Sequence, residues 1–159
     1  MILVLLGTQD KPFLRLLKMV SKEIDKGNIK EKVVAQTGYT AFSDKNMESF
    51  DFKNKEEIEK LIDKARIIIT HAGVGTITEC LEKGKKIIVV PRLKKYLEHT
   101  NDHQMQITKE FEMKGYVIAL YDNKRLSVAL EKIKTFKPKR YESNSENFWM
   151  KIKDYIDNI

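Results

Sequence analysis

Cysteine and long apolar runs are scarce in this chain, and each scarcity excludes a class of protein. The 159 residues include one cysteine, Cys80, so a disulfide framework is impossible and a reducing compartment is expected. We interpret Cys80 as a small buried hydrophobic residue. No stretch approaches the ~20 apolar residues that span a bilayer. The apolar run at residues 1–6 lacks the basic start of a signal peptide, so we expect a cytoplasmic protein.

The chain has a surplus of positive charge, but no segment concentrates it. Lys and Arg number 30 against 23 Asp and Glu, which gives a net charge of +7. This balance suits a nucleotide, a nucleic acid or an acidic membrane, or simply a lysine-rich solvated surface. An aromatic-rich RNA motif and a helix-turn-helix signature are both lacking, so we expect no nucleic-acid partner.

Apolar runs and helical periodicities alternate along almost the whole chain. We expect six strands, at residues 2–6, 32–37, 47–52, 67–70, 86–90 and 117–121. We expect helices at 12–26, from 55 after an Asn54 N-cap, at 76–83, at 102–114, from a cap at Asp122 or Asn123 to 133, and a last one opened by Glu142 or Ser145, over about 143–158. This alternation predicts one α/β domain, residues 1–159: a Rossmann-like, mostly parallel six-stranded sheet with helices on both faces.

The most informative stretch runs from residue 65 to residue 80. A short β-branched strand leads into a turn with glycines at 73 and 75, and a helix is expected to open at Thr76. Glycines allow close backbone approach, and a helix N-terminus presents free N–H groups, so this arrangement favours a phosphate. His71 follows the strand at its carboxyl end, where ligands bind in open α/β sheets.

The side chains around this turn admit more than one interpretation. His71 could be a base, a hydrogen-bond donor to phosphate or a structural residue; a metal ligand is disfavoured because His99 and His103 lack a matching partner set, so no metal is expected. Glu79 could accept two hydroxyls of a ribose, or simply stabilise the helix dipole from the surface.

Three further loops should meet this turn at the carboxyl ends of the strands. Gly7-Thr8-Gln9 is neither a dinucleotide fingerprint nor a Walker A loop; it is a phosphate or sugar contact or a plain turn. In Asn101-Asp102-His103-Gln104, Asp102 suits a helix N-cap, while His103 and Gln104 could hydrogen-bond sugar hydroxyls. Gln36-Thr37-Gly38 should lie at the same rim.

Taken together, these motifs resemble the donor-binding half of the GT-B glycosyltransferases, in particular the family-28 C-terminal domain. The resemblance rests on His71-Ala-Gly73-Val-Gly75-Thr76-Ile-Thr-Glu79, Gly84 to Pro91-Arg92, and Asp102-His103-Gln104, and it covers about residues 1–120. The start Gly7-Thr8-Gln9-x-x-Pro12-Phe13 is similar to a narrower group. That group holds small subunits of bacterial exopolysaccharide and capsule transferases and the catalytic subunit of the dolichol-linked N-acetylglucosaminyltransferase.

The resemblance implies a UDP-sugar donor site, with the UDP-sugar as substrate and no cofactor. The diphosphate would be held by His71, Gly73, Gly75 and Thr76, the ribose by Glu79, and the sugar would face His103 and Gln104, while Gly7 and Thr8 approach the phosphates from across the rim. Gln9 departs from the group's usual histidine. Departure of UDP would be stabilised by His71 and helix dipoles rather than by a cation.

The chain also lacks room for a second GT-B domain, where the acceptor and the catalytic base usually lie. The resemblance therefore implies a membrane-associated partner subunit that binds a lipid-linked acceptor and recruits this chain to the inner face of the membrane. The chemistry would be inverting transfer of a hexose to a polyprenyl-diphosphate-linked sugar, with the catalytic base on the partner. The alternative is a non-catalytic nucleotide-binding or enhancer subunit of such a complex.

The last helix carries an apolar stripe of six residues: Phe148, Trp149, Ile152, Tyr155, Ile156 and Ile159. Two uses of this stripe remain open. It could dock on the domain's own sheet. It could instead bind the partner or lie on the membrane, assisted by the basic residues Lys137, Lys139 and Arg140.

Overall fold

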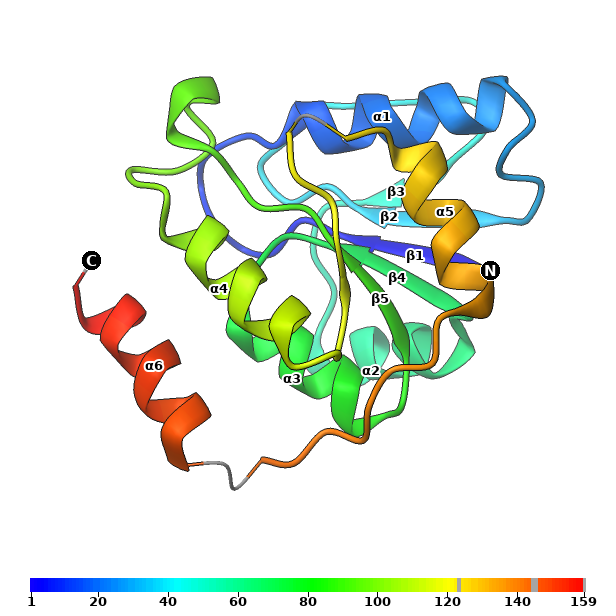
Figure 1. The fold of residues 1–159 in the computed structure, drawn as a ribbon. Coiled ribbons are helices and arrows are strands. Elements are labelled where there is room, and N and C mark those ends of the chain that lie inside the picture. The colour runs from blue at the N-terminus through cyan, green and yellow to red at the C-terminus, as the bar shows by residue number, and fades with distance from the viewer. Residues whose placement is uncertain (123, 144–145, 159) are drawn as a thin grey trace.

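A single sheet of six parallel strands forms the centre of the molecule (Figure 1). The computed structural model describes residues 1–122, 124–143 and 146–158. The strands lie in the order β3-β2-β1-β4-β5-β6. Their bounds are β1 Ile2–Leu5, β2 Val33–Gln36, β3 Glu48–Phe50, β4 Ile67–Thr70, β5 Lys86–Val89 and β6 Ile118–Ala119. The predicted Rossmann-like class and the six strands are confirmed.

Helices cover both faces of this sheet (Figure 1). Helices α1 (Leu14–Asp25) and α5 (Leu126–Thr135) pack on one face. Helices α2 (Lys55–Lys64), α3 (Val74–Glu82) and α4 (His103–Met113) pack on the other, and α6 (Glu146–Asp157) joins this second cluster. A short 3₁₀ helix, η1 (Lys94–Tyr96), follows β5.

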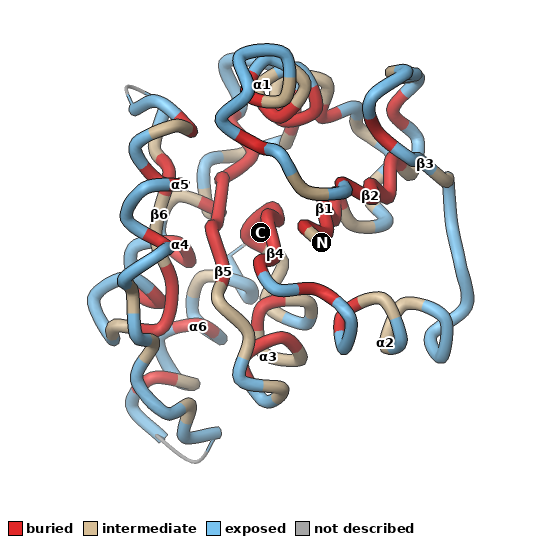
Figure 2. Tube along the Cα trace, turned by 90° about the vertical axis from the view of Figure 1, so that its right-hand side faces the viewer, coloured by how far each residue is buried: buried red, intermediate tan, exposed pale blue. Residues whose placement is uncertain are grey.

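The central strands are apolar throughout because both of their faces are covered. In β1, Ile2 and Val4 join the core beneath α1 and α5, while Leu3 and Leu5 join the core beneath α2, α3 and α4. All four residues of β1 and of β4 are buried, as the red segments of Figure 2 show. A parallel sheet between two helical layers therefore reads in sequence as continuous apolar runs rather than as alternation.

Several helix starts differ from the prediction by a few residues. Helix α1 begins at Leu14 rather than at Pro12, because Phe13 has non-helical backbone angles, φ −127° and ψ 51°; its N–H donates to Thr40 Oγ1. Helix α3 begins two residues earlier than predicted, at Val74. The N-cap of α5 is Arg125 and not Asp122, which instead accepts bonds from the loop after β5; the alternative cap, Asn123, lies outside the described residues.

The predicted start of α2 is confirmed in detail. The Asn54 side chain accepts from the Glu57 N–H at 2.9 Å, and the Glu57 carboxylate accepts from the Asn54 N–H at 3.1 Å. This reciprocal capping box satisfies two backbone donors that would otherwise be unpaired at the helix end. Because β3 runs parallel to β2 and α2 follows it, the capped end of α2 lies near the carboxyl ends of the strands.

The apolar stripe of α6 docks within the domain, which is the first of the two uses left open by the sequence. Phe148 and Ile152 are fully buried, and the Phe148 ring lies 5.0 Å from Phe111 of α4 in an edge-to-face contact. Trp149 and Tyr155 pack on the same cluster. The helix covers α4 and not the sheet itself, while Ile156 stays exposed; Ser145 and Ile159 lie outside the described residues.

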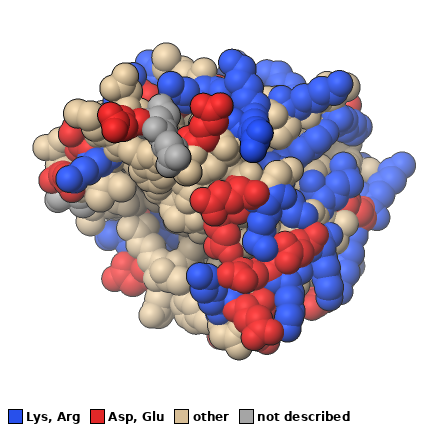
Figure 3. Space-filling view, turned by 90° about the horizontal axis from the view of Figure 1, so that it is seen from below, with Lys and Arg blue, Asp and Glu red and all other residues tan. Residues whose placement is uncertain are grey.

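The surface mixes charges of both signs. Figure 3 shows basic and acidic side chains side by side on the face that it presents. On α2 they pair at helical spacing, with Lys60 2.7 Å from Glu56 and Lys55 3.7 Å from Glu59. In the part of the chain that the structure describes, none of the helices has the length and hydrophobicity required to cross a bilayer.

Candidate functional site

A cavity of about 590 Å³ opens at the carboxyl ends of β1, β2 and β4. The loops after β1 and β4 and the N-terminal parts of α2, α3 and α4 surround it, as the parallel topology predicts. Its lining comprises Leu5, Gly7, Thr8, Gln9, Gln36, Lys53, Lys55, Ile58, Ile62, His71, Gly73, Gly75, Thr76, Glu79 and Gln104. All the predicted site residues except His103 are among them.

Two glycines enclose the His71 imidazole. A Cβ on Gly7 would lie 2.3 Å from Nε2 of His71, and a Cβ on Gly73 would lie 2.4 Å from Cε1. Gly7 also has a φ of +78°, which disfavours any other residue. Both positions therefore require glycine because the ring of His71 lies against them. Gly75 differs, since a Cβ there would meet nothing within 4 Å, so its backbone is open to a ligand.

His71 is uncharged at neutral pH. Burial, followed by the nearby charges of Arg92 and His99, lowers its pKa from 6.5 to about 3, and these effects outweigh the opposing effect of the Gln104 hydrogen bond. A buried imidazole next to a guanidinium gains nothing from a second positive charge. At this site His71 can therefore act on an anion as a neutral N–H donor, but not as a cation.

Gln104 connects the loops that follow β4 and β5. Its Oε1 accepts from the backbone N–H of Ala72 at 3.1 Å and from that of Arg92 at 3.0 Å. Its amide nitrogen lies 3.2 Å from Nδ1 of His71. Gln104 is 6% exposed, so its side chain is a buried bridge between the two loops as well as part of the cavity wall.

The neighbouring residues of the same segment serve α4 and the loop before it. Asp102 occupies the N-cap position but makes no capping bond; its Oδ1 accepts instead from the Lys94 N–H at 2.9 Å. His103 pairs through Nδ1 with Gln106 at 3.1 Å and does not line the cavity. Of the two residues predicted to face a sugar, only Gln104 reaches the cavity.

The first turn of α3 presents backbone donors to the cavity. Gly73 is the N-cap and makes no side-chain capping bond, so the N–H groups of Val74, Gly75 and Thr76 have no intrahelical acceptor. These groups and the helix dipole form an anion-binding end. Gly75 is thus inside the helix, not in the turn before it, and this brings the donors closer to His71 in sequence than predicted.

Two polar atoms in the cavity wall lack partners. Glu79 Oε1 and Gln9 Oε1 are buried, and neither has a hydrogen-bond partner in the described part of the chain. Glu79 lies in the second turn of α3, one turn beyond the free N–H groups. Buried oxygen atoms without partners are rare in folded proteins, so these two mark positions where ligand donors are expected.

Sequence reasoning missed the role of Arg92, which is 1% exposed. Its guanidinium donates to the carbonyls of Leu6 and Lys11, both at 2.7 Å, and it stacks on the Phe13 ring at 4.9 Å. Arg92 thereby clamps the backbone on both sides of the Gly7 turn. Burial lowers its pKa to about 10, so it stays charged. The only signal in the sequence is an arginine after the proline that ends an apolar strand.

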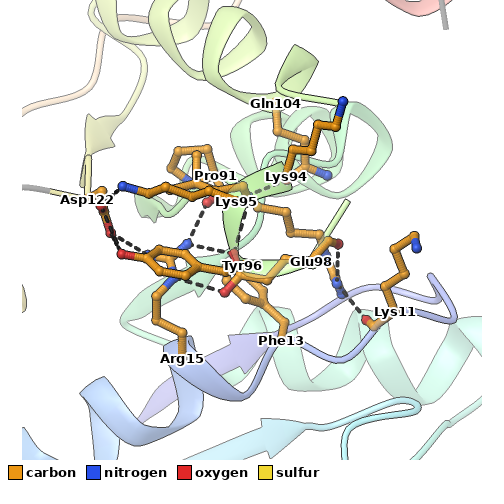
Figure 4. Close-up of polar contacts among 12 residues, drawn as sticks. Lys11, Phe13, Arg15, Pro91, Lys94, Lys95, Tyr96, Glu98, Gln104 and Asp122 are labelled. Carbon is orange, nitrogen blue, oxygen red and sulfur yellow. Dashed lines mark hydrogen bonds and ion pairs between the residues drawn. The ribbon is translucent and has the colours of Figure 1, made fainter. Parts of the chain in front are cut away.

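The basic loop after β5 is tied to α1 and to Asp122 (Figure 4). Arg15 donates to both carboxylate oxygens of Glu98, at 2.9 and 2.8 Å, and to the carbonyl of Pro91 at 2.9 Å. Tyr96 donates to Asp122 at 3.0 Å, and Lys95 pairs with the same carboxylate. These contacts hold the loop and its 3₁₀ turn, Lys94–Tyr96, against α1 and Asp122.

Comparison with known proteins identifies relatives of one kind. The family model described as the glycosyltransferase family 28 C-terminal domain matches residues 1–159. The UDP-N-acetylglucosamine transferase subunit ALG13 of Candida albicans is 28% identical over 125 residues, which are 76% of this chain and 37% of that protein. The UDP-N-acetylglucosamine–N-acetylmuramyl-(pentapeptide) pyrophosphoryl-undecaprenol N-acetylglucosamine transferase of Clostridium tetani is 30% identical over 138 residues, 84% of this chain and 34% of that protein.

Solved structures agree on the fold. The solution structure of ALG13 superimposes with a TM-score of 0.58 at 18% identity, over 95% of this chain and 93% of that one. The crystal structure of Acinetobacter baumannii MurG gives a TM-score of 0.56 at 18% identity, over 96% of this chain and 44% of that one. The chain thus spans about a third of the length of the two curated relatives described above.

Proposed function

Because the chain belongs to glycosyltransferase family 28, through that family's C-terminal domain, we propose that it is the donor-binding subunit of a two-component inverting glycosyltransferase. Its substrate is a UDP-sugar, and its partner is a membrane-associated subunit that binds the acceptor. The observation that carries the proposal is the cavity of about 590 Å³, in which free helix donors and an unpartnered carboxylate oxygen face one space.

The diphosphate belongs at the first turn of α3. Gly75 and Thr76 present backbone N–H groups there, and Gly75 leaves open space for a phosphate to approach. His71 adds a neutral donor from the end of β4, and Gly7 and Thr8 border the same space from the β1 turn. Stabilisation of departing UDP by fixed donors requires no proton transfer from His71.

The ribose belongs at Glu79. A carboxylate accepts two hydroxyl donors, and Oε1 of Glu79 has no protein donor among the described residues. The apolar wall formed by Ile58 and Ile62 of α2 offers a surface for the base. Lys53 and Lys55 at the capped end of α2 add positive charge at the mouth. His103 lies outside the lining and is left out of the proposed contacts.

The relatives guide the choice of sugar and acceptor. The names of the Candida albicans and Clostridium tetani proteins both specify UDP-N-acetylglucosamine as donor, and the second specifies a pyrophosphoryl-undecaprenol acceptor. The proposed donor is accordingly a UDP-hexose of the N-acetylglucosamine type, and the proposed acceptor is a sugar linked to a polyprenyl diphosphate. The partner would hold this chain at the inner face of the membrane and supply the catalytic base.

Exopolysaccharide or capsule assembly is the proposed setting. Its support is the segment Gly7-Thr8-Gln9-x-x-Pro12-Phe13, which resembles the start of small subunits from such systems. The name of the Clostridium tetani relative specifies a different acceptor, an N-acetylmuramyl-(pentapeptide) pyrophosphoryl-undecaprenol. An assay with lipid-linked acceptors from both kinds of pathway separates the settings, since only one acceptor should be glycosylated.

The second candidate function is a non-catalytic nucleotide-binding or enhancer subunit of the same complex. The bulk of the cavity wall lies in this chain, so both candidates predict UDP binding. They differ in transfer at low donor concentration: Glu79→Ala in the complex should lower it in proportion to the lost UDP affinity for a donor-binding subunit, and leave basal transfer intact for an enhancer.

The first experiment is calorimetry on the full chain with UDP, UDP-N-acetylglucosamine and ADP. The proposal expects binding of the two uridine nucleotides in preference to ADP. The second is transfer of radiolabelled sugar to a lipid-linked acceptor after co-expression with the membrane subunit. Absence of UDP binding by both the chain and the complex would refute the proposal.

A further inference from the structure

The orientation of the Gln104 amide is set by its backbone partners. Two N–H donors, those of Ala72 and Arg92, point at one atom of the amide at 3.1 and 3.0 Å. Only the oxygen can accept both, so the other atom is the NH₂ group. Turning the amide over would place NH₂ against two N–H donors and leave all three without an acceptor.

This assignment determines the proton on His71. The NH₂ group of Gln104 lies 3.2 Å from Nδ1 of His71 and is a donor, so Nδ1 must be the acceptor. A neutral imidazole that accepts at Nδ1 carries its hydrogen on Nε2. The Nε2 atom lies between Gly7 and Gly73, beside the cavity, and among the described residues it has no hydrogen-bond partner.

We infer that Gln104 is a positioning residue: by donating to Nδ1 it keeps the Nε2–H of His71 directed at the diphosphate subsite. This inference rests on the proposed function and assigns Gln104 a task other than contact with the sugar. The backbone partners fix the orientation of the Gln104 amide, because this one group bonds to the loops after β4 and β5 and to the imidazole at the same time.

The charges around His71 act in the same direction. Arg92, from the loop after β5, and His99, from the segment before α4, both oppose a positive charge on the ring. An amide N–H facing Nδ1 also leaves no acceptor for a second ring proton. His71 is therefore held as a single neutral species with its one donor toward the cavity.

The decisive measurement is made on the wild-type chain. Nitrogen-15 NMR of labelled histidine, with His71 assigned from the His71→Gln variant, should show Nε2 protonated and Nδ1 unprotonated from pH 5 to pH 8. A proton on Nδ1 at pH 7, in either a neutral or a charged ring, overturns the inference. This result does not depend on ligand binding, so it stands apart from a failure of the proposed function.

Gln104→Glu tests the consequence, with Gln106→Glu as the matched control. Gln106 lies two residues further along α4 at an exposed position, so its variant adds the same charge away from the cavity. The Gln104→Glu carboxylate can still accept from the backbone, but it requires a donor on Nδ1. At pH 8, UDP and UDP-N-acetylglucosamine should both bind about tenfold to a hundredfold more weakly, and the control should match wild type.

The ratio of the two affinities separates positioning from sugar contact. If Gln104 positions His71, the affinities of both ligands should fall by the same factor, because both ligands carry the diphosphate. A loss confined to UDP-N-acetylglucosamine would mean that Gln104 touches the sugar, and would overturn the inference. If Gln104→Glu does not fold, the wild-type nitrogen shifts alone decide.

Discussion

Replacing Glu79 by alanine should weaken UDP binding while leaving the fold intact. Oε1 of Glu79 is buried and has no hydrogen-bond partner among the described residues, so the side chain contributes no bond through that atom in the free protein. Glu79 lies in the second turn of α3, and alanine has at least as high a helix propensity as glutamate. A buried acceptor without a donor costs free energy, and its removal relieves that cost.

The expected effect is small on stability and large on binding. The free energy of unfolding of Glu79→Ala should stay within about 1 kcal/mol of wild type, because the lost contacts and the relieved polar atom offset each other. A hydrogen bond from a ribose hydroxyl to a carboxylate contributes about 1.5–3 kcal/mol. The dissociation constant of UDP should therefore rise about tenfold to a hundredfold.

The assay combines urea unfolding with calorimetry. Glu82→Ala is the matched control, since it removes the same charge from an exposed position on the same helix. UDP lacking both ribose hydroxyls should bind wild type and Glu79→Ala equally. A variant that binds UDP as tightly as wild type but unfolds more easily would show that Glu79 is a structural residue.

Four further predictions concern the His71 ring, the first turn of α3 and α6. Gly7→Ala should lose at least about 2 kcal/mol in unfolding free energy, because its Cβ would lie 2.3 Å from Nε2 of His71 at a φ of +78°. Gly75→Ala should be at least as stable as wild type but should bind UDP more weakly. Equal losses of unfolding free energy in Gly7→Ala and Gly75→Ala, measured by urea unfolding, would contradict this. The pKa of His71 is about 3 in the folded state and 6.5 in the unfolded state, so the unfolded state takes up the proton first as the pH falls. The free energy of unfolding should therefore fall by about 2 kcal/mol between pH 7 and pH 5. His71→Gln should lack this loss in paired urea titrations. Phe148→Ala should lower the unfolding free energy by about 3–5 kcal/mol, because the buried Phe148 ring packs against Phe111. A melting temperature close to that of wild type would show that α6 is not docked in solution.

The sheet could be predicted from the sequence because each central strand is buried on both faces. Runs such as Ile67–Thr70 carry that burial in their composition, and the glycine turns and Asn54 mark where helices begin and end. The meeting of the loops after β1 and β4 follows from parallel topology alone. These features depend on local sequence and a general rule of connection.

The interior of the site could not be predicted in this way. The need for glycine at positions 7 and 73 arises from one imidazole ring between them, which no local pattern encodes. Gln104 can donate and accept, so its sequence position says nothing about which partners it takes. Arg92 is a cation that binds carbonyl groups, whereas sequence reasoning looks for a carboxylate. Apart from the contact between Gly73 and His71, which lie two residues apart, these contacts join segments distant in the chain.

The short outer strands limit how another chain can attach. β3 and β6 bound the sheet and contain three and two residues, so each offers few free backbone groups for pairing. Such edges disfavour the addition of another strand. They therefore disfavour fibrillar self-association as well as binding by partners that extend the sheet. A subunit that joins this domain must therefore recognise it through side chains on its helices and loops, where a change of sequence can alter the choice of partner without disturbing the sheet.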